Sequence, residues 1–234
     1  MRPTSVFSAI AATALAAGML SAAPADAGPG RPSPPAGKAA VATTLGQAGG
    51  TLTVCNGTVP AGITLDVGAA GSPAYVAATS GVLTSFTTVT NSKTGQVRAL
   101  VLGAATTPDR LAVAGKSPKQ TVSTSKSNTF PIRLPIQAGQ RLGLGWTASG
   151  MACAVQGVAG DVSKAAAPFD PDTTNDFVYS TTLSGFRPNI SAVLEPDEDG
   201  DAFGDISQDA CPQSALTQVA CPARSASCTA SCTS

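Results

Sequence analysis

Short runs of alternating apolar and polar residues fill the chain between about residues 41 and 194. The runs are rich in Val, Thr, Leu and Ile and are separated by Gly, Pro and Asn, which is typical of antiparallel strands joined by turns. None of them has the periodicity of an amphipathic helix. Asn56 and Gly57 predict the tight turn of a hairpin over residues 51–59. The other predicted strands cover residues 62–67, 75–78, 81–89, 96–102, 110–114, 129–136, 141–146, 152–158 and 189–194.

This number of short strands without a convincing helix predicts an all-β fold, namely a two-layer antiparallel sandwich of the jelly-roll type. An immunoglobulin-like sandwich is the alternative. It is less favoured because Trp146 lies only seven residues before Cys153, instead of on a strand well separated from both cysteines of the domain. Residues 164–180 are predicted to form the one long loop inside this body.

The first residues of the chain resemble an export signal. Arg2 precedes an alanine-rich apolar run over residues 6–23, and Ala25-Asp26-Ala27 has the small-x-small pattern that signal peptidase cleaves. We therefore expect a secreted, extracellular protein without stable membrane insertion. A retained anchor is the alternative, because the run approaches the length of about 18 residues that can span a bilayer.

The composition then changes along the chain in a way that predicts its organisation. Residues 28–38 are rich in Pro and Gly, and the last residues are small and polar. The expected parts are a signal peptide at 1–27, a linker at 28–38, a β-sandwich domain at 39–194, an acidic loop with a disulfide at 195–222 and a flexible tail at 223–234.

An acidic segment follows the last predicted strand. Seven of the fourteen carboxylates of the chain lie between Glu195 and Asp209, with no Lys or Arg among them. Four aspartates follow the spacing 1, 3, 5, 9 of a loop that wraps a divalent cation, with glycines at the bends. Calcium suits this loop because it accepts many oxygens in loose geometry, whereas magnesium needs a strict octahedron and zinc prefers His or thiolate ligands. A solvated acidic linker is the alternative.

The sequence DEDGDAFGDISQDACP resembles a thrombospondin type 3 calcium repeat, whose pattern is D-x-D-G-D-G-x-G-D followed by Asp and Cys-Pro. The resemblance implies calcium ligation by aspartate side chains and by the backbone carbonyl of Phe203. Ala202 replaces the glycine of the repeat, which predicts strain if this residue has positive φ. The expected metal ligands are Asp197, Asp199, Asp201, Phe203, Asp205 and Asp209.

A wider resemblance covers most of the mature chain. The stretches GVLTSFTT, GQVRALVL, FPIRLPIQAGQRLGL and AVLEPDEDGDAFGDISQDACP are similar to those of a group of uncharacterised secreted actinobacterial proteins. This similarity supports the architecture and the calcium loop, but it brings no known activity.

Six cysteines agree with an oxidising compartment. Their connectivity does not follow from sequence alone, but neighbourhood favours three pairs. A zinc site built from the four C-terminal cysteines is the alternative, although no CxxC pair supports it. The favoured pairs are Cys55 with Cys153, Cys211 with Cys221, and Cys228 with Cys232.

The net charge of zero hides an uneven distribution. Residues 28–194 contain twelve basic and six acidic side chains, and the bias is steepest from Lys93 to Arg141. A basic face of this kind can attract an anionic polymer such as a cell-wall glycan. Because the cations are well separated in sequence, solvated strand faces are the simpler interpretation, and we expect no nucleic-acid binding.

The chain contains no histidine, which excludes Ser-His-Asp and Cys-His catalysis. Asp170, Asp172 and Asp176 could supply the carboxylates of a glycoside hydrolase or a second calcium site, but aspartates near prolines more often form turns. The aromatic residues able to stack on a sugar are few, with Trp146 the best placed, and each is equally suited to the core. The others are Tyr75, Phe177 and Tyr179.

These features predict a secreted, non-enzymatic, calcium-binding β-sandwich protein that acts as an extracellular structural or adhesion module. An extracellular glycan or a cell-surface protein is the expected partner. A carbohydrate-binding module and a carboxylate-dependent glycoside hydrolase are the alternative functions.

Overall fold

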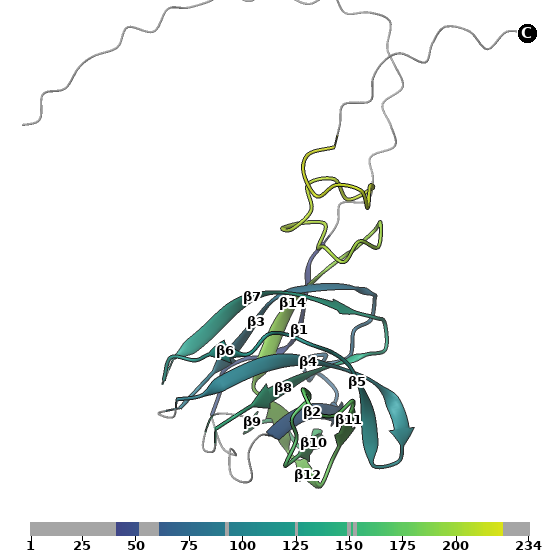
Figure 1. Ribbon diagram of the computed structural model, residues 1–234. Helices are drawn as coiled ribbons and strands as arrows, with labels where there is room; N and C mark the ends of the chain where they lie inside the picture. Colours follow the sequence, from purple (N-terminus) through teal and green to yellow (C-terminus); the bar gives the residue numbers. More distant parts are fainter. Residues whose placement is uncertain are drawn as a thin grey trace, which may run out of the picture. The chain divides into compact units, whose positions relative to one another are not determined.

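The computed structural model describes residues 41–51, 61–91, 94–124, 126–148, 151 and 154–221, and these residues form antiparallel sheets that face each other (Figure 1). The described residues contain no helix, so the predicted all-β antiparallel sandwich is confirmed, while its jelly-roll form stays a prediction. The strands are β1 Thr43–Gln47, β2 Ala61–Val67, β3 Gly81–Val89, β4 Gln96–Thr107, β5 Arg110–Lys116, β6 Gln120–Thr121, β7 Ser127–Ile136, β8 Arg141–Trp146, β9 Ala154–Gln156, β10 Val162–Ala166, β11 Asp176–Val178, β12 Thr181–Ser184, β13 Phe186–Pro188 and β14 Ile190–Glu195.

The smaller main sheet has the order β1-β14-β3-β7, and the larger has the order β11-β5-β4-β8-β2-β10-β12 with β6 added to β4. β9 and β13 form a separate pair. The last strand, β14, thus lies in the middle of the smaller sheet and carries the acidic segment out from the edge of the core. Among the described residues, no helix has the length and apolar character needed to cross a membrane.

The main core lies between the sheets and follows from the alternation of apolar residues along the strands. Leu83 and Phe86 of β3 pack there with Leu142 and Leu144 of β8, and all four are almost completely buried. Leu142 and Leu144 are two residues apart and so point to the same face of β8. Leu83 and Phe86 are three apart, and the register shift between Leu83 and Ser85 brings both to the core.

The continuous apolar run in β4 has a separate cause. Val101 belongs to the main core, whereas Leu100 and Leu102 belong to a second buried cluster on the opposite face of the larger sheet. Phe169 and Phe177 cover this second cluster, with their ring centroids 4.9 Å apart in an edge-to-face arrangement. Both faces of β4 are therefore buried, which explains why apolar residues do not alternate with polar ones there.

The predicted long loop over residues 164–180 is therefore partly wrong. Its first residues complete β10 and its end contains β11, which pairs with β5. The predicted strand at 75–78 is also wrong, since it makes only the single bridge from Val76 to Arg141. The sequence prediction missed β1, β6, β10, β11, β12 and β13, which are short and partly exposed. The hairpin predicted at 51–59 lies largely outside the described residues.

A buried ion pair joins the connections at one end of the sandwich. Asp161 is completely buried, and its carboxylate accepts hydrogen bonds from Nε of Arg187 and from Oγ of Ser72. The backbone N–H groups of Ala69 and Val158 donate to the same carboxylate, each over 2.9 Å. Three segments of the chain, at residues 69–72, 158–161 and 187, thus meet at one acidic side chain.

Candidate metal centre

Three aspartates gather immediately after β14. Asp197, Asp199 and Asp201 each place a carboxylate oxygen within 4.8 Å of the other two. Pro196 precedes this group, and the chain turns through positive φ at Gly200 (76°) and Ala202 (69°). The alternate spacing of the aspartates, together with these bends, brings side chains into a group that an extended strand would point to opposite faces.

Local hydrogen bonds hold the group in place. Asp197 accepts the N–H groups of Gly200 at 2.9 Å and Ala202 at 3.1 Å. Oδ1 of Asp199 accepts from the backbone of Asp201, whose own Oδ1 accepts from the N–H of Phe203. Each carboxylate therefore uses part of its acceptor capacity within the loop, as turn-forming aspartates do.

Two carboxylate oxygens of the acidic segment are buried without a partner. Oδ2 of Asp199 and Oδ2 of Asp209 have no hydrogen-bond donor among the described residues. Burying an acceptor that carries negative charge is unfavourable unless a donor or a cation compensates it. The unpartnered oxygen of Asp199 lies in the three-aspartate group, which is the arrangement expected of a cation ligand.

The remaining predicted ligands lie outside that group of three. The carboxylate of Asp205 accepts the N–H of Glu198, and its pKa is raised by burial first and then by the neighbouring carboxylates, chiefly that of Asp197. Oδ1 of Asp209 accepts the N–H of Cys211 at 2.7 Å. Ligation by Asp205, by Asp209 and by the carbonyl of Phe203 stays a prediction.

The acidic segment packs on the sandwich through contacts that the sequence pattern did not reveal. The guanidinium of Arg133 in β7 lies 4.1 Å from the centre of the Phe203 ring, and Nε2 of Gln208 donates to the carbonyl of Ile132 over 2.7 Å. At Gly204, an added Cβ would come within 2.6 Å of Thr84 and of Glu195. The glycine therefore permits a close approach that any other residue would obstruct.

Glu195 is the main link between the segment and the sheet. Its carboxylate is buried and accepts the N–H groups of Ile206 at 3.1 Å and Ser207 at 2.8 Å, and the hydroxyl of Thr84 at 3.0 Å. Burial alone would raise its pKa, but the hydrogen bonds from Ser207, Thr84 and Ile206 outweigh burial and hold the pKa below its usual value.

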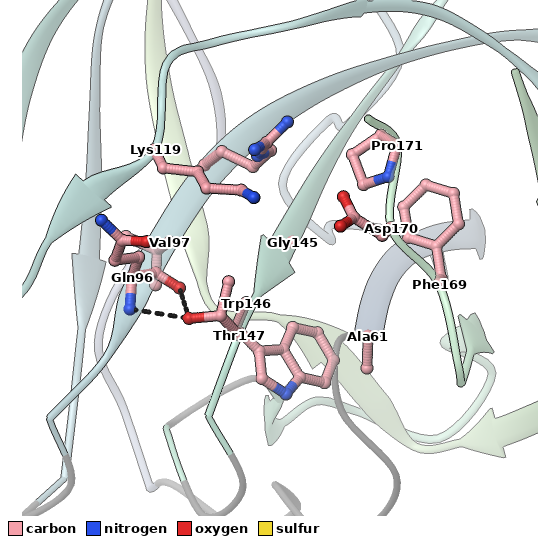
Figure 2. A pocket seen from close by; sticks show the side chains of 11 residues that line it. Ala61, Gln96, Val97, Lys119, Gly145, Trp146, Thr147, Phe169, Asp170 and Pro171 are labelled. Atoms are coloured by element: carbon pink, nitrogen blue, oxygen red, sulfur yellow. Dashed lines mark hydrogen bonds between the residues drawn. The ribbon is translucent and has the colours of Figure 1, made fainter. Parts of the chain in front are cut away.

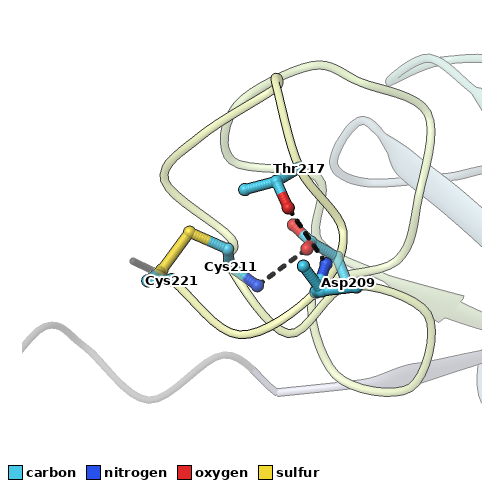
Figure 3. Close-up of a disulfide and its surroundings, with 5 residues drawn as sticks. Asp209, Cys211, Thr217 and Cys221 are labelled. Atoms are coloured by element: carbon cyan, nitrogen blue, oxygen red, sulfur yellow. Dashed lines mark hydrogen bonds between the residues drawn. A yellow bond between two sulfur atoms is a disulfide. The ribbon is translucent and has the colours of Figure 1, made fainter. Parts of the chain in front are cut away.

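A disulfide closes the end of the acidic segment, as Figure 3 shows. The predicted bond between Cys211 and Cys221 is confirmed, with a sulfur–sulfur distance of 2.06 Å. Asp209 lies beside it through the hydrogen bond from the N–H of Cys211. The other four predicted disulfide cysteines, Cys55, Cys153, Cys228 and Cys232, lie outside the described residues.

Ala202 stands where the calcium-repeat pattern has glycine, and its φ is positive. Among the described residues it is the only one other than glycine with a positive φ. The left-handed conformation costs alanine about 1 kcal/mol more than glycine. We therefore expect Ala202→Gly to lower the calcium dissociation constant about fivefold in calorimetry, since glycine favours the conformation that groups the aspartates. Ala210→Gly, at an exposed position without positive φ, is the control and should not tighten binding. Equal affinities for Ala202→Gly and the unmodified protein would show that the loop holds the positive φ of this residue before calcium binds.

Two of the three aspartates that could serve a glycoside hydrolase form ion pairs with arginines instead. Asp172 binds Arg98, and Asp176 lies 3.4 Å from Nη1 of Arg110. Hydrogen bonds from Arg98, and then from Lys119 and Lys116, hold the pKa of Asp172 well below its usual value. A carboxyl group with so low a pKa is unsuited to act as a general acid.

The aromatic candidates for sugar stacking are mostly interior. Tyr75 and Phe177 are almost completely buried, and the hydroxyl of Tyr75 donates to the carbonyl of Pro188 over 2.6 Å. Burial raises the pKa of Tyr75 above its ordinary value. Tyr179 lies beneath Nζ of Lys164, 4.8 Å from the ring centre. Trp146 is 9% exposed and lines a small pocket on the larger sheet.

No protein-family model matches the chain, and no curated protein or solved structure matches it either.

Proposed function

We propose that this chain is a secreted, non-enzymatic calcium-binding protein whose β-sandwich acts as an extracellular structural or adhesion module. One observation carries the calcium assignment: among the described residues, no donor reaches a buried oxygen of Asp199 inside a group of three converging carboxylates. Oxygen ligands in a flexible loop are the set that calcium prefers over other divalent metals. The bound ion would neutralise charge that the segment itself cannot, since Lys and Arg are absent from residues 195–209.

Calcium in this place would have a structural consequence. The three aspartates lie between Glu195 and Phe203, two residues that fix the acidic segment to the sandwich. An ion that orders the loop would therefore also favour these contacts, because a ligand that binds only the folded arrangement stabilises it by mass action. This supports a role in holding the end of the sandwich rigid.

The non-enzymatic assignment rests on the ion pairs and hydrogen bonds in which the candidate catalytic acids are already engaged. The chain has no histidine, Asp172 and Asp176 pair with arginines, and Asp170 shapes a turn. A binding partner remains the natural use of such a module. The basic bias of the body favours an extracellular glycan, and we adopt this partner as part of the proposal.

Calorimetry on the calcium-free protein tests the metal assignment. We expect a calcium-dependent heat with a dissociation constant of about 10⁻⁴ to 10⁻³ M, the range of extracellular modules. The double variant Asp199→Asn, Asp201→Asn should abolish this heat, because it removes two converging charges. Glu198→Gln removes a charge from an exposed side chain outside the group of three and should retain it. A heat that persists in the double variant, or none in the unmodified protein, would overturn the assignment.

A further inference from the structure

Three cationic side chains, from β4, from β5 and from the connection between β5 and β6, converge on the carboxylate of Asp172. Arg98 in β4 donates two hydrogen bonds to it, 2.9 Å from Nη1 to Oδ1 and 2.8 Å from Nη2 to Oδ2. Nζ of Lys116 lies 3.0 Å and Nζ of Lys119 lies 2.9 Å from the same carboxylate. Two parallel bonds from a guanidinium are the geometry by which proteins recognise a carboxylate.

The cluster carries more positive charge than Asp172 neutralises, since three cations share one anion. The guanidinium of Arg98 is buried, whereas the side chains of Asp172, Lys116 and Lys119 are 42%, 39% and 32% exposed. Asp170 lines the adjoining pocket and its Oδ1 accepts the backbone N–H of Asp172, so its charge offsets part of the excess and leaves about one net positive charge. The surplus charge therefore faces solvent, where an external anion can reach it.

A pocket adjoins this cluster and shares two of its cations, Arg98 and Lys119. Figure 2 shows the indole of Trp146 on one side of it and the side chains of Asp170 and Pro171 on another. The hydroxyl of Thr147 also lines the pocket, close to Gln96. With a volume of about 10 Å³ the pocket has room for about one water molecule, so it adjoins the cation cluster without itself accommodating a sugar ring.

We infer that Arg98, Lys116 and Lys119 form a binding site for the carboxylates of an acidic polysaccharide, and that Asp172 occupies this site when the polysaccharide is absent. The inference rests on the proposed function, in that it specifies the chemistry of the glycan partner. It adds an internal competitor, Asp172, which the acidic polysaccharide must displace.

Displacement is compatible with the way the connection is anchored. Phe169 is buried against Phe177, so the start of the connection stays fixed to the sheet. A ligand carboxylate in the place of Asp172 would re-form the two hydrogen bonds to Arg98 and the contacts with the lysines, so the exchange would leave no buried cation unpaired. Because Pro171 forms part of the pocket wall, movement of this turn would widen the pocket beside Trp146.

Binding of the full chain to immobilised polygalacturonate, followed by interferometry at low salt, tests the inference. Asp172→Asn should bind about tenfold tighter than the unmodified protein, because the competing charge is removed. The double variant Lys116→Gln, Lys119→Gln should bind about tenfold weaker. Lys126→Gln, an exposed lysine outside the cluster, is the matched control and should change the affinity less than about twofold. Thermal unfolding of each variant establishes that it is folded.

Three outcomes would overturn the inference: no retention of either the unmodified protein or Asp172→Asn, weaker binding by Asp172→Asn, or equal losses in the lysine double variant and Lys126→Gln. Retention on double-stranded DNA but not on polygalacturonate would assign the cluster to a nucleic acid instead. Calcium calorimetry on the same samples separates the proposals, because an intact calcium heat without polygalacturonate binding contradicts only the polysaccharide assignment.

Discussion

Asp161→Ala is expected to lower the free energy of unfolding by about 3–5 kcal/mol, because removing one partner of a buried ion pair leaves the other charge uncompensated. The substitution would leave the side chain of Arg187, which is also buried, without this carboxylate. It would also remove the acceptor for the hydroxyl of Ser72 and for two backbone N–H groups. Urea unfolding followed by Trp146 fluorescence measures the loss.

Asp66→Ala is the matched control for this experiment. Asp66 also pairs with an arginine, Arg141, over 2.8 Å, but its side chain is 33% exposed, so the expected loss is about 0–1 kcal/mol. If the two variants lose the same stability, the burial of Asp161 does not have the importance assigned to it.

The buried carboxylate of Asp161 should also make the stability of the protein depend on pH. Burial would raise the pKa of Asp161, but hydrogen bonds from Ser72, Val158, Ala69 and Arg187 outweigh burial and hold it well below its usual value. Asp161 therefore binds a proton more readily in the unfolded chain than in the folded protein. Its contribution to stability is fully present above its unfolded pKa of about 3.9 and is lost as the pH falls toward its folded pKa. The unmodified protein should lose more stability than Asp161→Asn between about pH 5 and pH 2.

The strands that could be predicted are those in which one face is buried against the main core. β3 and β8 begin and end at the predicted residues, because their alternation continues to a turn on each side. β10 and β11 were hidden inside a predicted loop, since the second cluster around Phe169 and Phe177 buries only a few residues of each. Short runs contain too few positions for a periodicity to emerge.

The candidate site was predictable where its chemistry is local. The spacing of Asp197, Asp199 and Asp201 is enough to bring their carboxylates together, because turns of a few residues do so. The cluster around Asp172 was not predictable, because its cations come from strands and connections that pair only through the sheet. For the same reason the role of Glu195 in fixing the acidic segment was missed: its partner Thr84 is 111 residues away.

Glu195→Ala is expected to lower the free energy of unfolding by about 3 kcal/mol and to release the acidic segment from the sheet. The substitution would remove the acceptor for Thr84, Ile206 and Ser207 at once, and hydrogen bonds to a charged acceptor contribute about 1.5–3 kcal/mol each when single partners are removed. The expected loss of stability is close to the largest value for a single bond, not three times that value. Water can hydrogen-bond the freed backbone groups once the acidic segment separates from the sheet, so the three losses do not add.

Hydrogen exchange at the amides of Ile206 and Ser207 distinguishes this release from a general loss of stability. Both amides should exchange much faster in Glu195→Ala, while those of β3 and β8 keep most of their protection. Glu195→Gln should show a smaller effect, because its amide nitrogen can donate to the hydroxyl of Thr84 while its oxygen still accepts the N–H groups of Ile206 and Ser207, which both donate to Oε2 of Glu195. Glu198→Ala, at an exposed neighbouring position, should leave exchange unchanged. Uniform acceleration throughout the sandwich in Glu195→Ala would show that Glu195 stabilises the whole domain without specifically fixing the acidic segment.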